Sequence, residues 1–305
     1  MKIINLYISG LKEAYSQKKI VTIIFAITLF LTLIVAMAFN SVIKSNLGDR
    51  PQVYKLLGDF DFATYNDLMN NYGTLINPLT TVIMWMSVFY LFFTVFFSGG
   101  ILQIASNKFE RVSGKNFFGG CSKFFLRFLR LGIYVLVIRF LVVLVLVLLF
   151  MVLNSDLIAS STEPKIFYTY LIWTIVHLLF FWLVSIIADY AKVILVKEDS
   201  KKVWSALWNG LKFSMKRLHI TFPLYFIISL TTFLLAALYW VVESEIAMTN
   251  AATILLVALI QQVFVWLRFF SKSWILTSEY EYYNEYASIR IQPIQTQEIL
   301  LNEAL

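Results

Sequence analysis

The chain contains 305 residues, of which 60% are hydrophobic and 14% are charged, and its formal net charge is +7. Soluble domains carry about 25% charged residues. This composition excludes an ordinary soluble protein, because so many apolar side chains cannot all be buried in one core. The basic residues lie beside the apolar segments, which favours anionic lipid headgroups over nucleic acid as partners. The single cysteine, Cys121, excludes an intrachain disulfide and a cysteine-rich metal site, and we expect a packed thiol.

The first segment, residues 1–17, has the periodicity of an amphipathic helix that lies flat in the membrane interface. Its apolar face carries Ile3, Ile4, Tyr7, Leu11, Ala14 and Tyr15. An apolar run of transmembrane length follows at residues 20–39. Residues 36–38, Ala-Met-Ala, fit a signal-peptidase site, but the long charged lead and the length of the run favour a retained first transmembrane helix.

A polar connection at residues 41–77 separates the first span from the second, which we expect at residues 79–104. Asn77 and Pro78 predict the start of this second helix, with Asn77 as its cap and the proline in its first turn. Near its end, residues 98–100 read Ser-Gly-Gly, and such small residues permit a kink or a close helix crossing.

The middle of the chain repeats this order of amphipathic helix and span. Residues 107–130 carry six basic residues and a phenylalanine-rich stripe, which predicts a second interfacial helix before a third span at residues 131–153. Glu163 and Pro164 then open a fourth span, which runs past Asp189.

The amphipathic pattern is clearest at residues 201–218, where Trp204 and Trp208 lie on the apolar face of the helix and lysines lie on its polar face. The remaining segments are a fifth span at 220–242, a sixth span at 251–276, an acidic, tyrosine-rich exit at 279–286 and a C-terminal tail at 287–305. The sequence therefore predicts an all-α polytopic membrane protein, in which residues 1–305 form a single domain with six transmembrane helices and amphipathic interfacial helices.

The distribution of Lys and Arg predicts the orientation. The N-terminal segment has four, residues 107–130 have six and residues 192–217 have seven, whereas the three opposite connections have three, one and none. Positive charge marks the cytoplasmic side of a membrane protein. We therefore expect a multi-pass protein of a bacterial-type cell inner membrane, with cytoplasmic N and C termini and cytoplasmic interfacial helices.

A threefold repeat of helical hairpins is one interpretation of this pattern. Gly10-Leu11-Lys12 recurs as Gly210-Leu211-Lys212, and Gly120 occupies the matching place between them. The units would be residues 1–106, 107–200 and 201–286, and they would be parallel because each contains two spans. The alternative is that any inner-membrane protein with basic cytoplasmic loops looks somewhat repetitive.

Two short sequences carry a family resemblance. Gly99-Gly100-Ile101 precedes a basic, phenylalanine-rich helix, and Asp189-Tyr190-Ala191-Lys192 is followed by Leu195-Val196. Over roughly residues 80–240 the chain resembles uncharacterised bacterial polytopic proteins, which are similar to the membrane domain fused to some glycerophosphodiester phosphodiesterases. The chain lacks the catalytic barrel of those enzymes, so the resemblance implies the membrane architecture and not the phosphodiesterase activity.

Catalytic patterns are missing from the sequence: there is no metal-ligand spacing, no phosphate-binding glycine loop and no nucleophile–base set. We therefore predict no enzyme activity, no metal and no cofactor. The polar residues expected inside the spans are Arg139, His177, Asp189, Gln261, Gln262 and Arg268. We expect Arg139 to pair with Asp189, because an unpaired arginine near the bilayer centre costs about 2.5–3.5 kcal/mol, and we expect Arg268 to reach the interface.

The expected function is that of a membrane interaction or lipid-handling module that contacts the anionic inner leaflet and, in addition, other membrane proteins. The interfacial residues expected to contact lipid are Trp204, Trp208, Lys212, Lys216, Arg217, Phe124 and Arg127. The alternative is a small-solute or ion transporter with a polar path past Arg139, His177 and Gln261. A lipid-modifying enzyme is disfavoured by the lack of a nucleophile–base set.

Overall fold

The computed structural model describes residues 2–46, 62–107, 113–155, 162–247 and 250–303, and all regular secondary structure in these ranges is helical. The helices are α1 (Lys2–Ser16), α2 (Lys18–Asn46), α4 (Phe62–Ser106), α5 (Gly114–Leu153), α7 (Glu163–Lys197), α8 (Val203–Lys216), α9 (Leu218–Ser244) and α10 (Ala251–Glu303). Within the described ranges, six of them (α2, α4, α5, α7, α9 and α10) are long and apolar enough to cross a membrane. The expected all-α fold with six helices long and apolar enough to span a membrane is therefore confirmed.

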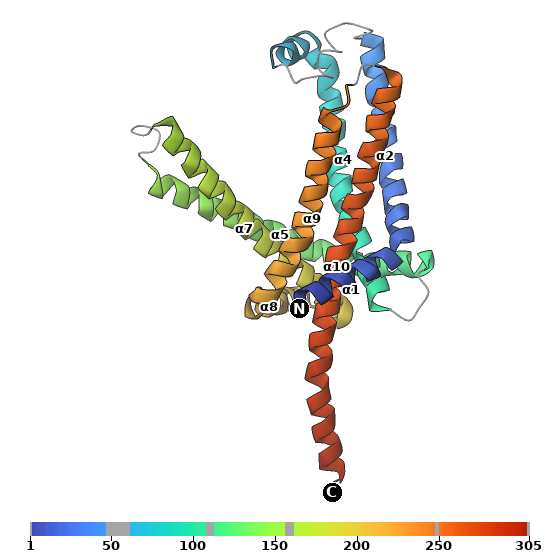
Figure 1. Cartoon of the computed structure of the whole chain (residues 1–305), viewed down its shortest axis with the longest axis vertical. Coiled ribbons are helices and arrows are strands. Elements are labelled where there is room, and N and C mark those ends of the chain that lie inside the picture. Colours follow the sequence, from blue (N-terminus) through green and yellow to red (C-terminus); the bar gives the residue numbers. More distant parts are fainter. Residues whose placement is uncertain (1, 47–61, 108–112, 156–161, 248–249, 304–305) are drawn as a thin grey trace.

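Four of the long helices, α2, α4, α9 and α10, stand side by side in an upright bundle (Figure 1). The hairpin of α5 and α7 leans away from this bundle as a separate arm. The two short helices α1 and α8, together with residues 114–130 of α5, lie across one end of the bundle, which we call the base. α10 continues beyond the base to the C-terminal end of the chain (Figure 1).

The hydrophobic core lies at the base. One cluster joins the start of α2, the end of α4, the first half of α5 and the end of α7, and it includes the fully buried Phe117, Phe124 and Leu102. A second cluster joins α1, α7, α8, α9 and α10 around Tyr190 and Tyr282. Away from the base the long helices expose large apolar side chains on most of their faces. Such a surface is compatible with a lipid solvent rather than with water.

Three glycines bring the base helices into close contact with the long helices. A Cβ atom on Gly10 of α1 would overlap Ser278 of α10, whose Cα lies 2.8 Å from that position. A Cβ on Gly120 of α5 would overlap the Gln103 side chain of α4, and one on Gly210 of α8 would lie 3.0 Å from the backbone of α7. Glycine permits such backbone approach between helices. The same three helix pairs make the most extensive contacts in the fold.

Two predicted boundaries are wrong. Pro78 lies inside α4 and does not start it, although proline lacks the backbone N–H of an ordinary helix residue. The hydroxyl of Thr80 donates to the Asn77 carbonyl at 2.7 Å in the turn that follows the proline. Residues 114–153 form the single helix α5, so the predicted interfacial helix and third span are continuous. Residues 47–61 and 108–112, parts of the predicted polar connection and basic loop, lie outside the described residues.

The segment expected as the acidic, tyrosine-rich exit from the sixth span, residues 279–286, continues α10, and part of it is buried. α10 has no break at residues 276–279, and Ser278, Glu279, Tyr280 and Tyr282 are buried. The physical reason is that α1 packs across this part of α10. Trp274 donates its indole N–H to the Tyr7 carbonyl at 3.0 Å, and Thr277 donates its hydroxyl to the Gly10 carbonyl at 3.1 Å. This segment of α10 is therefore part of the base core.

Candidate functional site

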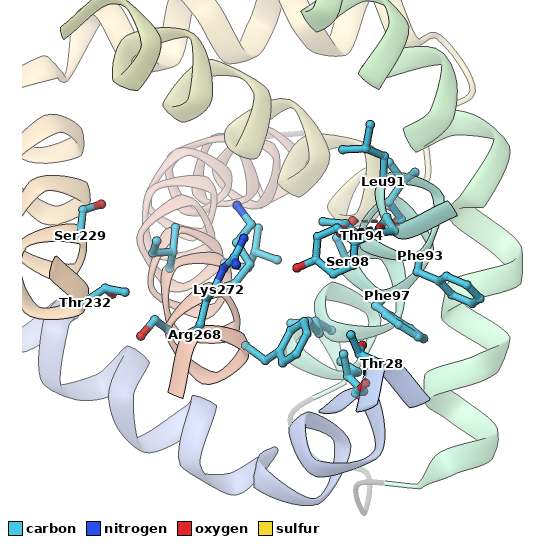
Figure 2. Close-up of a pocket in the computed structure, with 18 of the residues that line it drawn as sticks. Thr28, Leu91, Phe93, Thr94, Phe97, Ser98, Ser229, Thr232, Arg268 and Lys272 are labelled. Atoms are coloured by element: carbon cyan, nitrogen blue, oxygen red, sulfur yellow. Dashed lines mark hydrogen bonds between the residues drawn. The ribbon is translucent and has the colours of Figure 1, made fainter. Parts of the chain in front are cut away.

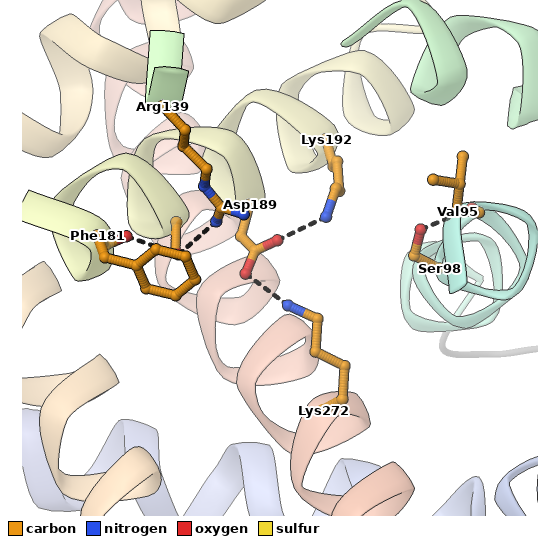
Figure 3. Close-up of polar contacts among 8 residues, drawn as sticks. Val95, Ser98, Arg139, Phe181, Asp189, Lys192 and Lys272 are labelled. Carbon is orange, nitrogen blue, oxygen red and sulfur yellow. Dashed lines mark hydrogen bonds and ion pairs between the residues drawn. The ribbon is translucent and has the colours of Figure 1, made fainter. Parts of the chain in front are cut away.

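A buried ion-pair cluster joins the end of α7 to the first half of α10. Asp189 of α7 is 2% exposed, and each of its carboxylate oxygens accepts a hydrogen bond from a lysine ammonium. Lys192 donates to Oδ1 at 2.7 Å and Lys272 donates to Oδ2 at 2.7 Å (Figure 3). Lys192 follows Asp189 by three residues and therefore lies on the same helical face. Lys272 comes from α10, so the carboxylate ties the two helices together.

A cavity of ≈ 570 Å³ adjoins this cluster. It lies among α2, α4, α9 and α10, and Lys192 contributes the lining from α7. Figure 2 places Lys272 and Arg268 between the hydroxyl-bearing faces of α9 and α4. The volume falls within the range of about 300–1,000 Å³ that is typical of small-molecule sites. The cavity is therefore large enough to hold a substantial part of an organic ligand.

The lining combines three cations with a mainly apolar wall. Lys192, Arg268 and Lys272 supply the cations, and Phe93, Phe97, Phe264 and Phe269 belong to the apolar wall. Hydroxyl groups are interspersed, but several donate to carbonyls of their own helix, as Thr28 does to Ile24 and Thr232 does to Ile228. These hydroxyls therefore add little polarity. The arrangement is suited to an anionic group attached to an apolar body.

A second buried carboxylate lies behind the ion-pair cluster. Glu279 is 2% exposed, and it interacts electrostatically with Asp189, Lys192 and Lys272. Within the described residues, neither of its carboxylate oxygens has a hydrogen-bond partner. The sequence interpretation missed Glu279, because residues 279–286 contain three glutamates and resemble a solvated exit from the membrane.

The predicted pair of Arg139 with Asp189 does not form. The Arg139 guanidinium donates to the Ser185 hydroxyl at 2.8 Å and lies 4.2 Å from the centre of the Phe181 ring (Figure 3). Asp189 lies one turn beyond Ser185, and the two lysines occupy both of its oxygens. The prediction failed because Ser185 and Phe181 hold the Arg139 guanidinium, while Lys192 and Lys272 supply both partners of the Asp189 carboxylate.

The predicted polar path is only partly assembled. Arg139 and His177 line one small cavity of ≈ 20 Å³ between α5 and α7. Gln261 is exposed and Gln262 is half-buried on α10, and neither lines this small cavity or the large one. Arg268 is exposed and lines the large cavity. The polar residues that the sequence singled out are therefore divided between the arm and the bundle.

The expected lipid-contact residues also divide into two groups. Trp204 and Trp208 are 63% and 51% exposed, and Lys212 and Lys216 are exposed beside them. Arg217 is half-buried, with its guanidinium 3.9 Å from the centre of the Tyr286 ring. For Phe124 the expectation is wrong, because the side chain is 0% exposed and packs against Gly99 of α4. Cys121, on the same helix face, is buried as expected.

For Arg127 the expectation of lipid contact is wrong as well, because its guanidinium forms an ion pair that joins α5 to the turn between α7 and α8. Arg127 donates to Asp199 at 2.6 Å, and Lys123 lies 2.9 Å from the other oxygen of the same carboxylate. The pKa of Asp199 lies below its ordinary value, mainly because of the hydrogen bond from Arg127 and next because of that from Lys123. Asp199 has a φ of 43°, a left-handed conformation that Asp adopts more readily than most residues.

Metal binding has no ready set of ligands in the described ranges, which contain no group of three or more His, Cys, Asp or Glu residues able to hold an ion. Comparisons with models of known protein families, with curated proteins and with solved structures find no match to this chain.

Proposed function

We propose that this protein is a non-enzymatic membrane protein that binds an anionic lipid in the cavity beside Asp189. The observation that carries the proposal is the composition of the cavity wall. Three cationic side chains, Lys192, Arg268 and Lys272, line a space whose remaining wall is mainly apolar. A lipid with an anionic headgroup has both of the chemical parts that such a site matches.

The charge balance supports an anion. The three cations of the wall are opposed by the carboxylate of Asp189, which is buried and pairs with two of them, and by that of Glu279, which interacts with the same two lysines. Arg268 is not part of that pair network and is available to a ligand. A cation in a site of low dielectric constant is costly without a counter-charge, and a bound phosphate or carboxylate group would supply one.

The apolar wall supports a lipid over an inorganic ion. The cavity of ≈ 570 Å³ is far larger than one small anion needs, and its wall includes phenylalanines from α4 and α10. Thr28, which lines the cavity, is ten residues into α2, or about 15 Å along the helix. The apolar part therefore extends well into the span, where an acyl chain would lie.

The proposal includes the orientation expected from the Lys and Arg distribution. With both termini in the cytoplasm, the base lies at the inner leaflet, where anionic lipids are concentrated. The exposed Trp204 and Trp208 would then lie at headgroup depth. The three glycine contacts at Gly10, Gly120 and Gly210 support the threefold repeat, since each joins a base segment to a different long helix.

Lipid binding is tested with the purified full-length chain in a detergent with a neutral headgroup. The bound lipid is measured by native mass spectrometry for phosphatidylglycerol and for zwitterionic phosphatidylcholine, with inorganic phosphate as a competitor. We expect preferential retention of phosphatidylglycerol, and about tenfold weaker retention in Arg268→Gln, because one charge-assisted contact is lost. A Lys115→Gln variant, which removes an exposed cation of α5, is the matched control and should retain the lipid.

Two outcomes contradict the proposal. Equal retention of the anionic and the zwitterionic lipid would remove the role of the cations. Displacement of the lipid by inorganic phosphate at comparable concentration would show that the acyl chain contributes nothing, and it would favour the alternative of a small-anion transporter.

A further inference from the structure

Glu279 is the buried charged group that the lipid site does not use directly. It lies seven residues after Lys272 on α10, about 10 Å along the helix and on nearly the same face. Its side chain is buried, and within the described residues both oxygens lack a hydrogen-bond partner. A buried carboxylate in this state is costly when ionised. Its proton occupancy therefore depends strongly on the charges around it.

Those charges belong to the cavity. The titratable groups that interact electrostatically with Glu279 are Asp189, Tyr190 and Lys192 from α7, Tyr225 from α9 and Lys272 from its own helix. Arg217, at the end of α8, donates to the Tyr282 hydroxyl of α10 at 3.5 Å, and Glu13 of α1 is half-buried. Residues 97–106 of α4 carry no charged side chain, Lys12 of α1 is exposed, and Lys2 of α1 pairs with Glu285 at 2.9 Å.

We propose that Glu279 takes up one proton when the cavity binds its anion and releases it when the anion leaves. The inference rests on the proposed function and adds to it a coupling to pH. The proton comes from water and returns to water, so that each bound negative charge is accompanied by one proton.

The direction of the coupling follows from the charge count. With Glu279 ionised, the group formed by Lys192, Arg268, Lys272, Asp189 and Glu279 carries one net positive charge, and with Glu279 protonated it carries two. An anion beside the lysines therefore binds better to the protonated form. By linkage, a bound anion also favours protonation to the same extent. Asp189 cannot serve in this role as readily, because both of its oxygens are held by lysines.

The test measures the affinity of the full-length chain for fluorescent phosphatidylglycerol in neutral detergent as a function of pH. The headgroup is a phosphodiester whose charge is constant over the assay range. For the unsubstituted chain we expect the affinity to rise about tenfold for each unit by which the pH falls within the range where Glu279 titrates, since one proton is taken up per anion. Glu279→Gln should bind with an affinity that is high and nearly independent of pH. Glu281→Gln, two residues further along α10, is the matched control and should keep the dependence.

The outcomes separate this inference from the function on which it rests. A pH dependence that persists in Glu279→Gln overturns the coupling, while the proposed lipid site stands if Arg268→Gln still weakens binding. Affinity that Arg268→Gln leaves unchanged overturns the lipid site itself. A second measurement needs no variant: addition of phosphatidylglycerol to the weakly buffered protein with a pH indicator should show proton uptake, and no uptake at saturating lipid overturns the coupling.

Discussion

The ion-pair cluster at Asp189 makes the most specific energetic prediction. Asp189→Asn leaves Lys192 and Lys272 close together without their counter-charge, because both ammonium groups lie 2.7 Å from the carboxylate. Removal of one partner from a buried pair costs about 3 kcal/mol. Lys272→Met leaves Asp189 with Lys192 as a remaining partner, so its cost should be smaller, about 1.5 kcal/mol for one charged hydrogen bond.

A double-mutant cycle measures the pair directly. The combined Asp189→Asn and Lys272→Met variant should be less destabilised than the sum of the two single variants, by about 1 kcal/mol. The assay is equilibrium unfolding in mixed micelles, followed by circular dichroism. Arg139→Met provides the control cycle, because Arg139 donates to Ser185 instead, and its loss should add to that of Asp189→Asn. Strict additivity of Asp189→Asn and Lys272→Met would refute the assignment of partners. A coupling between Asp189→Asn and Arg139→Met larger than that between Asp189→Asn and Lys272→Met would refute it as well.

Three further predictions concern packing, pH and orientation. Gly10→Ala should destabilise the fold by about 1–3 kcal/mol, because the new Cβ would overlap α10. Gly132→Ala is the control and should not destabilise it, because the added Cβ meets no atom within 4 Å. Thermal unfolding in detergent compares the two variants. Asp199 has a lowered pKa in the folded chain, so it contributes stability, less than about 1 kcal/mol, that is present above its unfolded pKa of about 3.9. This stability is lost as the pH falls through the folded pKa. Asp199→Asn should remove this part of the pH profile of unfolding. An impermeant thiol reagent applied outside cells should label Glu245→Cys at the end of α9 and not Ser205→Cys on α8, and the reverse pattern would contradict the orientation.

The sequence was sufficient to predict the helices, since length and apolar composition identify a span without tertiary information. It was insufficient where packing decides the outcome. Pro78 is a strong helix-start signal beside Asn77, yet the helix continues through it. The acidic, tyrosine-rich segment at 279–286 has the composition of a solvated exit, but α1 returns from the other end of the chain and covers it.

The candidate site was predictable only in part, for a related reason. Asp189 could be recognised as a buried charge from its place in an apolar helix, and Lys192 lies three residues away on the same face. Its second partner, Lys272, is 83 residues away, and helical periodicity does not say which long helices are neighbours. The cavity has no sequence signal of its own, because residues from five helices and from most of the chain line it.

The central claim is that the cavity is occupied by an anionic lipid, and site-specific photocrosslinking tests it most directly. A benzophenone amino acid replaces Ser229, which lines the cavity on α9, or Leu238, which is exposed on the same helix. In membranes that contain phosphatidylglycerol and phosphatidylcholine, crosslinking at Leu238 reports the composition of the bulk bilayer. The account predicts that the lipid captured at Ser229 is enriched in phosphatidylglycerol over that captured at Leu238, and that Arg268→Gln abolishes the enrichment. The same lipid composition at both positions would contradict it.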